Sequence, residues 1–298
     1  MEAAPTVGTP HWESPSLARA FGTEYATVMN PTLLFAVALG LLCGGASPAP
    51  GAPLETVNLE ELTWTELRDL VRSGMTTIVL PVGGTEQNGP HMALGKHNTR
   101  VKVLAERIAR ALGHALVGPA IAHVPEGRLD PPTGHMRFPG TITVPDDVFQ
   151  RVLESSARSA RVHEFRDIVI LGDHGSTQSG ARAVATRLNR EWAKSPVRVH
   201  AIAEYYRAAT VGFRQALKAR GYRDDELGTH AALTDTSLML AIEPRMVRLP
   251  LMRRGTGLDG GDGVDGDPTR ATAELGQLGV ELIVRDTVAA IRTSIRSR

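Results

Sequence analysis

From Leu54 onward the chain alternates strand-length apolar runs with amphipathic helical patterns, and this alternation restricts its fold more than any other feature. In the helical segments the apolar residues recur three and four positions apart, as at Val101, Leu104 and Ile108. Helices of this length between short apolar runs indicate βαβ units and a mainly parallel sheet with helices on both faces. We predict strands over 77–82, 114–124, 166–172 and 197–203, and helices over 65–73, 100–112, 146–165, 180–194, 234–242 and 271–296.

This α/β pattern favours a single domain over residues 54–298, because it contains neither an internal repeat nor a second shift in composition. A chain of 298 residues with 42% hydrophobic content can bury a sizeable core. Its formal net charge is +1 and it has no basic run, which argues against nucleic acid as a partner. The single cysteine, Cys43, excludes an internal disulfide and a cysteine-based zinc cluster. Any metal must therefore bind to His, Asp, Glu or amide side chains.

Residues 1–53 differ from the rest and are predicted to form an N-terminal extension. The apolar run 33–42 is too short to span a bilayer, but it suits a signal peptide of about 29–46. Met29 is a candidate start, and the Pro/Ala stretch that ends at Pro53 is typical of a linker. We predict a periplasmic or secreted protein without a membrane anchor in its mature form. The alternative, a short helix packed on the domain, would leave the protein in the cytoplasm.

Four loops collect the polar side chains that carry chemistry. They cover residues 83–98, 126–143, 171–180 and 228–237. The first and third directly follow predicted strands, and the carboxyl ends of parallel strands face the same crevice. The side chains expected to converge there are Glu86, His97, Asp173 and His174.

These loops resemble those of the creatininase family (creatinine amidohydrolases). The stretch "PVGGTEQNGPHMALGKHN" is similar to the family's P-x-G-x-x-E-Q-H-G-P-H-L-P-x-x-x-D, and "GHMRFPGTIT" is similar to H-x-x-F-P-G-T-I. "LGDHGS" stands where the family has N-G-H-G-G-N, "THAALTDTSLML" resembles H-A-G-x-x-E-T-S-x-M-L, and "GVDGDPTRATAELG" resembles G-x-x-G-D-P-x-x-A-x-x-E-x-G. The matches run in order from about Leu62 to the C-terminus. The resemblance implies an α/β fold, a two-metal site, hydrolysis of cyclic or linear amides, and a homo-oligomer such as a hexamer.

The chain departs from the family at several metal ligands. By position, Glu86 keeps a ligand, whereas Asn88 replaces a His, His97 replaces the bridging Asp, and Asp173 replaces a His at the strand end. Since a carboxylate and an imidazole have exchanged places, Glu86, His97 and Asp173 would still suit zinc, manganese or iron. A neutral imidazole has one lone pair and cannot bridge two ions. We therefore predict a one-metal site, or a rebuilt two-metal site to which His174 or Asn88 contributes.

Catalytic and substrate-binding roles also follow from the resemblance. His230 stands in the place of the family's catalytic His and is expected to titrate near neutral pH and to protonate the leaving nitrogen. Asp235 would orient His230 or a substrate nitrogen, and Glu86 would act through the ion it binds. The residues expected to line the substrate site are His91, His135, Arg137 and Glu126. The alternatives are that His91 only shapes its loop and that the other three belong to the solvated surface.

The predicted function is hydrolysis of a C–N bond other than a peptide bond, in a small cyclic or linear amide, by a metal-activated water. One alternative is a non-catalytic module that binds a small molecule or a protein. Another is a hydrolase of a lactone, a formamide or a peptide on the same site. The three tryptophans, Trp12, Trp64 and Trp192, lie outside the four loops, which argues against creatinine itself as the substrate.

Overall fold

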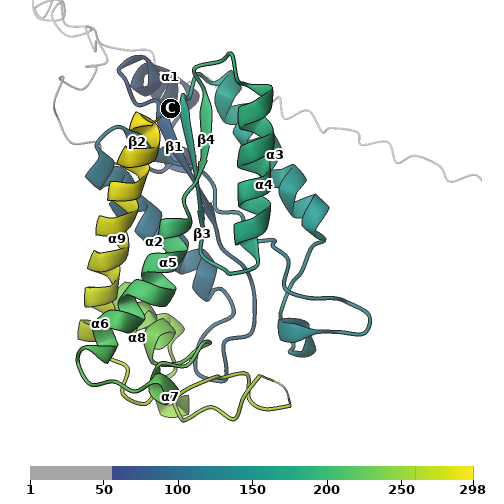
Figure 1. Cartoon of the computed structure of the whole chain (residues 1–298), viewed down its shortest axis with the longest axis vertical. Coiled ribbons are helices and arrows are strands. Elements are labelled where there is room, and N and C mark those ends of the chain that lie inside the picture. The colour runs from purple at the N-terminus through teal and green to yellow at the C-terminus, as the bar shows by residue number, and fades with distance from the viewer. Residues whose placement is uncertain (1–55, 259, 298) are drawn as a thin grey trace, which may run out of the picture. The chain divides into compact units, whose positions relative to one another are not determined.

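The computed structural model describes residues 56–258 and 260–297, and its strands form one parallel sheet (Figure 1). The strand order is β2–β1–β3–β4, with every pair of neighbours parallel. β1 pairs with β3 along its whole length. The predicted α/β fold with a mainly parallel sheet is thereby confirmed. The strands are β1 (Thr77–Val82), β2 (Ala115–Val117), β3 (Asp167–Gly172) and β4 (Arg198–Ala201).

Helices cover both faces of this sheet. The long ones are α1 (Trp64–Arg72), α2 (Lys96–Leu112), α3 (Asp146–Val162), α4 (Thr177–Glu191), α8 (Leu233–Ile242) and α9 (Ala273–Arg296). Because successive side chains of a strand point to opposite sides, neighbouring residues of β1 enter different cores. Val79 packs into a core with α2, α8 and α9, whereas Ile78 packs into a second core with α1, α3 and α4. Figure 1 shows α9 on one side of the sheet and α3 and α4 on the other.

The second strand is shorter than we predicted: it covers Ala115–Val117 rather than 114–124. The N–H of Gly118 still donates to the Val79 carbonyl, but Pro119 has no N–H with which to continue the ladder. Beyond it the chain touches β1 again through an isolated bridge between Ile121 and Val82. The rest of the predicted strand is therefore loop.

The helices also differ from prediction in two places. α2 begins at Lys96 rather than at residue 100, which places Lys96 and His97 in its first turn. Residues 204–227, which the sequence left unassigned, contain helical pieces too short to show a clear apolar period, and the first of them begins at Ala203, which was predicted to end a strand. These are α5 (Ala203–Arg207), the π-helical turn η3 (Ala208–Gly212), α6 (Phe213–Lys218) and α7 (Asp224–Leu227). The 3₁₀ turns are η1 (Leu59–Glu61), η2 (Gly134–Arg137), η4 (Pro244–Met246) and η5 (Leu249–Leu251).

The N-terminal extension predicted for residues 1–53, with its signal segment at about 29–46, lies outside the described residues. Its boundary and the export that it implies stay predictions. Among the helices of the described part, none combines the length and the apolar character needed to cross a bilayer.

α8 and α9 cross with their backbones in close contact at Gly276. A Cβ atom at Gly276 would overlap the carbonyl oxygen of Ser237 in α8, so only glycine fits there. One turn further along α9, a Cβ atom at Gly279 would lie 2.8 Å from Leu238 Cδ2. This close crossing fixes the position of α8, which carries Asp235.

Replacing Gly276 should test this crossing. We expect Gly276→Ala to lower the free energy of unfolding by about 1–3 kcal/mol, because the added methyl group must push the two helices apart. Urea denaturation measures the change. Gln277→Ala, at the exposed neighbouring position of α9, is the matched control and should change the stability little. Equal stability of the two variants would contradict the close crossing.

Candidate metal centre

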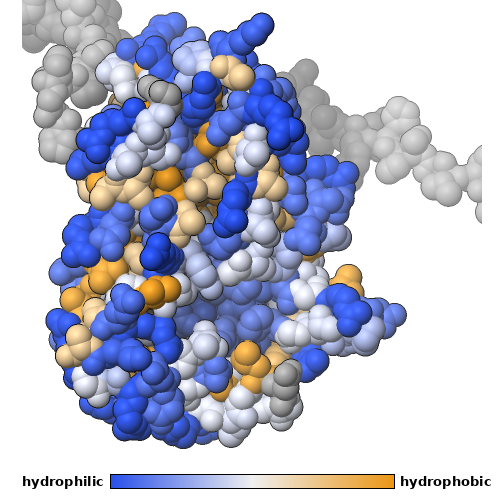
Figure 2. Space-filling view, in the orientation of Figure 1, coloured by the Kyte–Doolittle hydropathy of each residue, from blue (hydrophilic) through white to orange (hydrophobic). Residues whose placement is uncertain are grey.

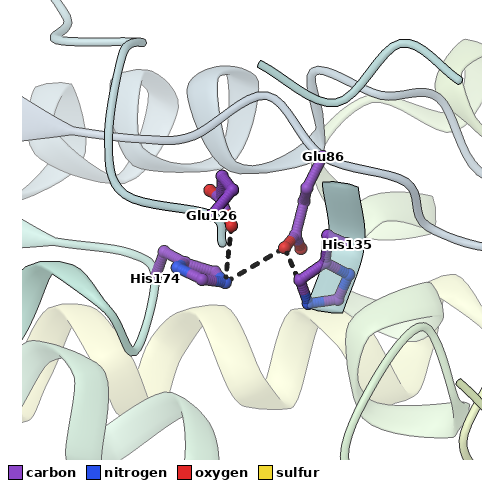
Figure 3. A group of neighbouring side chains, drawn as sticks. All are labelled: Glu86, Glu126, His135 and His174. Atoms are coloured by element: carbon purple, nitrogen blue, oxygen red, sulfur yellow. Dashed lines mark ion pairs between the residues drawn. The ribbon is translucent and has the colours of Figure 1, made fainter. Parts of the chain in front are cut away.

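The polar loops that follow β1 and β3 meet at the carboxyl edge of the sheet. Glu86 follows β1, His174 follows β3, and Glu126 and His135 belong to the long loop 126–143 that carries η2. Figure 3 shows the four side chains pointing toward a common centre. The face of the molecule is hollowed beside the loop that carries η2 (Figure 2). The expected convergence of strand-end loops therefore occurs, with a partly different set of side chains.

Glu86 is fully buried and lies among cationic and imidazole groups. Its Oε1 is 2.8 Å from His97 Nε2 and 3.5 Å from Lys96 Nζ. Its Oε2 is 3.0 Å from His174 Nε2 and 3.2 Å from His135 Nε2, without the geometry of a hydrogen bond to either. Burial alone would raise the pKa of Glu86, but the charges of His97 and Lys96 outweigh it and hold the pKa well below its usual range. Glu86 is therefore an ionised carboxylate.

Glu126 lies beside Glu86, but its pKa is shifted in the opposite direction. It is buried, and neither of its carboxylate oxygens accepts a hydrogen bond from the described residues. His174 Nε2 is 3.4 Å from Glu126 Oε2, again without hydrogen-bond geometry. Burial and the adjacent charge of Glu86 raise the pKa of Glu126 to about 9. A buried carboxylate with unpartnered oxygens costs free energy unless a cation compensates it.

These four groups fit a divalent metal ion. Glu86, Glu126, His135 and His174 each offer one ligand atom, and the four atoms lie within 4.8 Å of one another. Carboxylate oxygens and imidazole nitrogens together suit zinc, manganese or iron. Burial lowers the pKa of both His135 and His174, although the charge of Glu86 opposes it, and an imidazole must be neutral to bind a metal. The unpartnered oxygens of Glu86 and Glu126 give the arrangement the chemistry that a cation requires.

Of the predicted ligands Glu86, His97 and Asp173, only Glu86 belongs to this group of four. Asp173 is not among the four converging groups and accepts hydrogen bonds from Tyr205 Oη at 2.6 Å and Arg100 Nε at 2.9 Å. Its Oδ2 also lies 2.5 Å from His97 Nδ1, and the other nitrogen of that ring contacts Glu86. The carboxylate and the imidazole that had exchanged places are therefore partners of each other. Asp173 and His174 are consecutive, and of the two it is His174, also a predicted candidate, that joins the four converging groups.

Asn88 and His91 shape the first loop instead of facing the centre. The amide nitrogen of Asn88 donates to the carbonyl groups of Glu86 at 2.9 Å and Ala93 at 3.2 Å. His91 is wholly buried, and its Nε2 is 3.0 Å from Thr236 Oγ1 in α8. The predicted metal contact of Asn88 and substrate contact of His91 therefore stay predictions, since these side chains contact loop carbonyls and Thr236. Arg137 is exposed on η2, two residues from His135.

His230 lies at the edge of the centre in a fixed tautomer. Its Nε2 is 2.9 Å from the carbonyl oxygen of Gln87, to which it donates, so the lone pair is on Nδ1, 3.8 Å from Glu86 Oε1. Burial and the charge of Lys96 lower the pKa of His230 to about 3. His230 is therefore neutral near pH 7, unlike the titrating group that was expected. Gln87, rather than Asp235, orients its ring.

Asp235 is held by two cations from α2. Its Oδ2 is 3.2 Å from Lys96 Nζ, and its Oδ1 is 2.6 Å from Arg100 Nη1. It also accepts the backbone N–H of Ala231 at 3.0 Å. Burial would raise the pKa of Asp235, but the charges of Lys96 and Arg100 hold it well below its usual range. Asp235 therefore stabilises the buried cations.

The sequence analysis missed Lys96, Arg100 and Tyr205. One signal was available: Arg100 precedes Leu104 and Ile108 at intervals of four, so it falls on the apolar face of α2. An arginine on such a face needs a buried carboxylate partner. Its partners, Asp173 and Asp235, are distant in sequence and could not be identified from it.

Comparisons with known proteins agree with the sequence resemblance. The family model "Creatinine amidohydrolase" matches residues 60–291. A "Mycofactocin precursor peptide peptidase" of Mycobacterium tuberculosis is 30% identical over 241 residues, covering 72% of this chain and 84% of that protein. "Creatinine amidohydrolase" of Pseudomonas putida is 26% identical over 198 residues, covering 65% and 75%. A solved mutant creatininase of the "Zn-Zn type" aligns with a TM-score of 0.67 at 24% identity, covering 81% of this chain and 99% of that one, which is a likeness in fold.

The raised pKa of Glu126 predicts how the stability of the metal-free protein depends on pH. The folded state keeps the Glu126 proton up to about pH 9, whereas the unfolded chain releases it near pH 4.5, the ordinary pKa of a glutamate, so stability falls between these limits as pH rises. In Glu126→Gln the side chain cannot ionise, so this fall in stability with rising pH is absent. With a chelator present, we expect the free energy of unfolding of the variant to rise relative to that of the wild type. The difference should grow by up to about 1.4 kcal/mol for each pH unit across that window.

Urea denaturation at pH 5, 7 and 8.5 measures the difference. Glu60→Gln, at an exposed position, is the control and should follow the wild type. A constant difference between Glu126→Gln and the wild type at all three pH values would contradict the assignment.

Proposed function

Because the chain belongs to the creatininase family, we propose that it is a metal-dependent hydrolase of C–N amide bonds, with the metal bound by Glu86, Glu126, His135 and His174. The observation that carries the proposal is the convergence of these four ligand atoms around two buried carboxylates with unpartnered oxygens. The solved relative of the "Zn-Zn type" supports zinc, while the ligand chemistry also accommodates manganese or iron.

A bound divalent ion would polarise the scissile carbonyl and lower the pKa of a water molecule at the site. His230 Nδ1, with its lone pair on the side of Glu86, is positioned to accept the proton that this water loses. As the water oxygen bonds to the carbonyl carbon and the C–N bond breaks, His230 would return that proton to the leaving nitrogen. Gln87 keeps the ring in the required tautomer throughout.

A linear amide, including a peptide bond, is the substrate class that we favour. The relative named as a peptide peptidase supports a peptide, and the relative named as a creatinine amidohydrolase supports a small cyclic amide. In the described part of the chain, Trp64 is exposed at the start of α1 and Trp192 packs in the second core, so neither offers a flat ring to a creatinine-like substrate. The earlier restriction to bonds other than peptide bonds is therefore not part of the proposal.

The leading alternative is a non-catalytic module in which the exchanged residues mark loss of the metal. The four converging donors support the enzyme instead, because decay would not be expected to leave the buried oxygens Glu86 Oε2 and Glu126 Oε1 and Oε2 without partners at a free-energy cost. Export and a homo-oligomer are further proposals, which rest on the N-terminal pattern and the family resemblance.

Metal content tests the proposed ligands. We expect the wild type to retain zinc after dialysis, and His174→Asn to lower zinc affinity by at least about 10–100-fold because a ligand nitrogen is lost. Elemental analysis of the dialysed protein measures this. His123→Asn, which changes an exposed histidine, is the matched control. Zinc retained by His174→Asn at the level of the wild type would refute the ligand assignment.

Activity tests the role of His230. His230→Gln should keep its zinc but lower kcat by about 10²–10⁴-fold, because the proton acceptor is removed while the ligands remain. The assay uses zinc-loaded protein with short peptides, linear amides and creatinine. If the zinc-loaded wild type hydrolysed none of them, the binding-module alternative would be favoured.

A further inference from the structure

Lys96 is a buried cation that the proposed mechanism does not use. It lies in the first turn of α2, and its side chain is 1% exposed. Its Nζ is 3.5 Å from Glu86 Oε1 and 3.2 Å from Asp235 Oδ2. Because an ammonium group leaves water only when anions compensate it, these two carboxylates fix Lys96 next to the metal centre.

The two oxygens of Glu86 therefore face different environments. Oε1 faces Lys96 and His97, which approach it with nitrogen atoms. Oε2 faces the side where His135 and His174 lie, and it accepts no hydrogen bond from the described residues. One oxygen thus has a permanent cationic neighbour, and the other is open to an ion.

The side of Oε1 also lacks donors for a second ion. The Asn88 amide nitrogen donates to backbone carbonyls, and both nitrogens of His97 are engaged with carboxylates. Asp173 already accepts from Arg100 and Tyr205. These positions correspond to ligands of the two-metal site that the family resemblance implies. Here His97 and Asp173 contact each other, and Asn88 is engaged with backbone carbonyls.

The charge of the cluster favours one divalent ion over two. Among the described residues, its carboxylates are Glu86, Glu126, Asp173 and Asp235, and its cations include Lys96 and Arg100. Both ring nitrogens of His97 face carboxylates, so this ring is counted as a third positive charge, and the four ionised carboxylates then leave one negative charge. One divalent ion changes this to one positive charge, whereas two would leave the buried site with three positive charges.

We propose that the ammonium group of Lys96 takes the place of a second metal ion, so that the centre binds one divalent ion per chain. This inference rests on the proposed metal-dependent function. Lys96 compensates the Oε1 side of Glu86 without a metal, and at the same time it repels the ion bound on the Oε2 side. The site is then a single-ion centre with a built-in cation.

Zinc titration of the purified full chain, followed by calorimetry and elemental analysis, tests this. We expect about one equivalent in the wild type. Lys96→Met removes the repulsion between the ammonium group and the ion. We therefore expect zinc to bind more tightly, with a Kd lower by about tenfold or more. Mere structural damage would change the affinity in the opposite direction. Lys102→Met removes an exposed lysine from the same helix and should leave the Kd unchanged.

Two equivalents of zinc in the wild type would overturn the inference and leave the proposed function standing. Weaker zinc binding by a folded Lys96→Met would also overturn it. If Lys96→Met fails to fold, the stoichiometry of the wild type still decides. No zinc bound by either protein would overturn the proposed function and, with it, the inference.

Discussion

The carboxylate of Glu86, buried at the end of β1, is the charge around which this part of the molecule is arranged. An anion without access to water must be compensated by cations or hydrogen bonds, or it destabilises the fold. The first turn of α2 supplies this compensation through Lys96 and His97, while the end of β3 and the η2 loop bring His174 and His135 close to the other carboxylate oxygen. A requirement of electrostatics thus brings distant parts of the chain to one point.

A second set of ion pairs holds those segments in place. Arg100 contacts both Asp173, at the end of β3, and Asp235, in α8, so one guanidinium connects the sheet to two helices. Tyr205 of α5 adds a hydrogen bond to Asp173. α8 is itself seated on α9 by the close backbone crossing at Gly276. The position of the metal centre therefore depends on packing well outside it.

The architecture was predictable because its signals are local. Strand-length apolar runs and helical spacing identified β1, β3, α3, α4 and α9 to within a few residues. The motif loops were also recognisable, and the resemblance they carry agrees with the family assignment. The start of α2 was misplaced because Lys96 and His97 are polar and do not continue its apolar period. Lys96 and His97 are buried because they contact carboxylates, and the spacing of apolar residues in the helix does not reveal these contacts.

The sequence by itself determined the α/β fold, the family and the loops that carry the chemistry, since each follows from spacing along the chain. Only the tertiary structure decided which polar side chains meet. Asp173 and His174 are adjacent in sequence, yet one contacts Arg100 and the other contacts Glu86. The roles of Glu126 and Lys96 likewise depend on contacts with residues up to 139 positions away in the sequence. The physical reason is that a buried charge is defined by its partners, and those partners come together only when the sheet and its helices have packed.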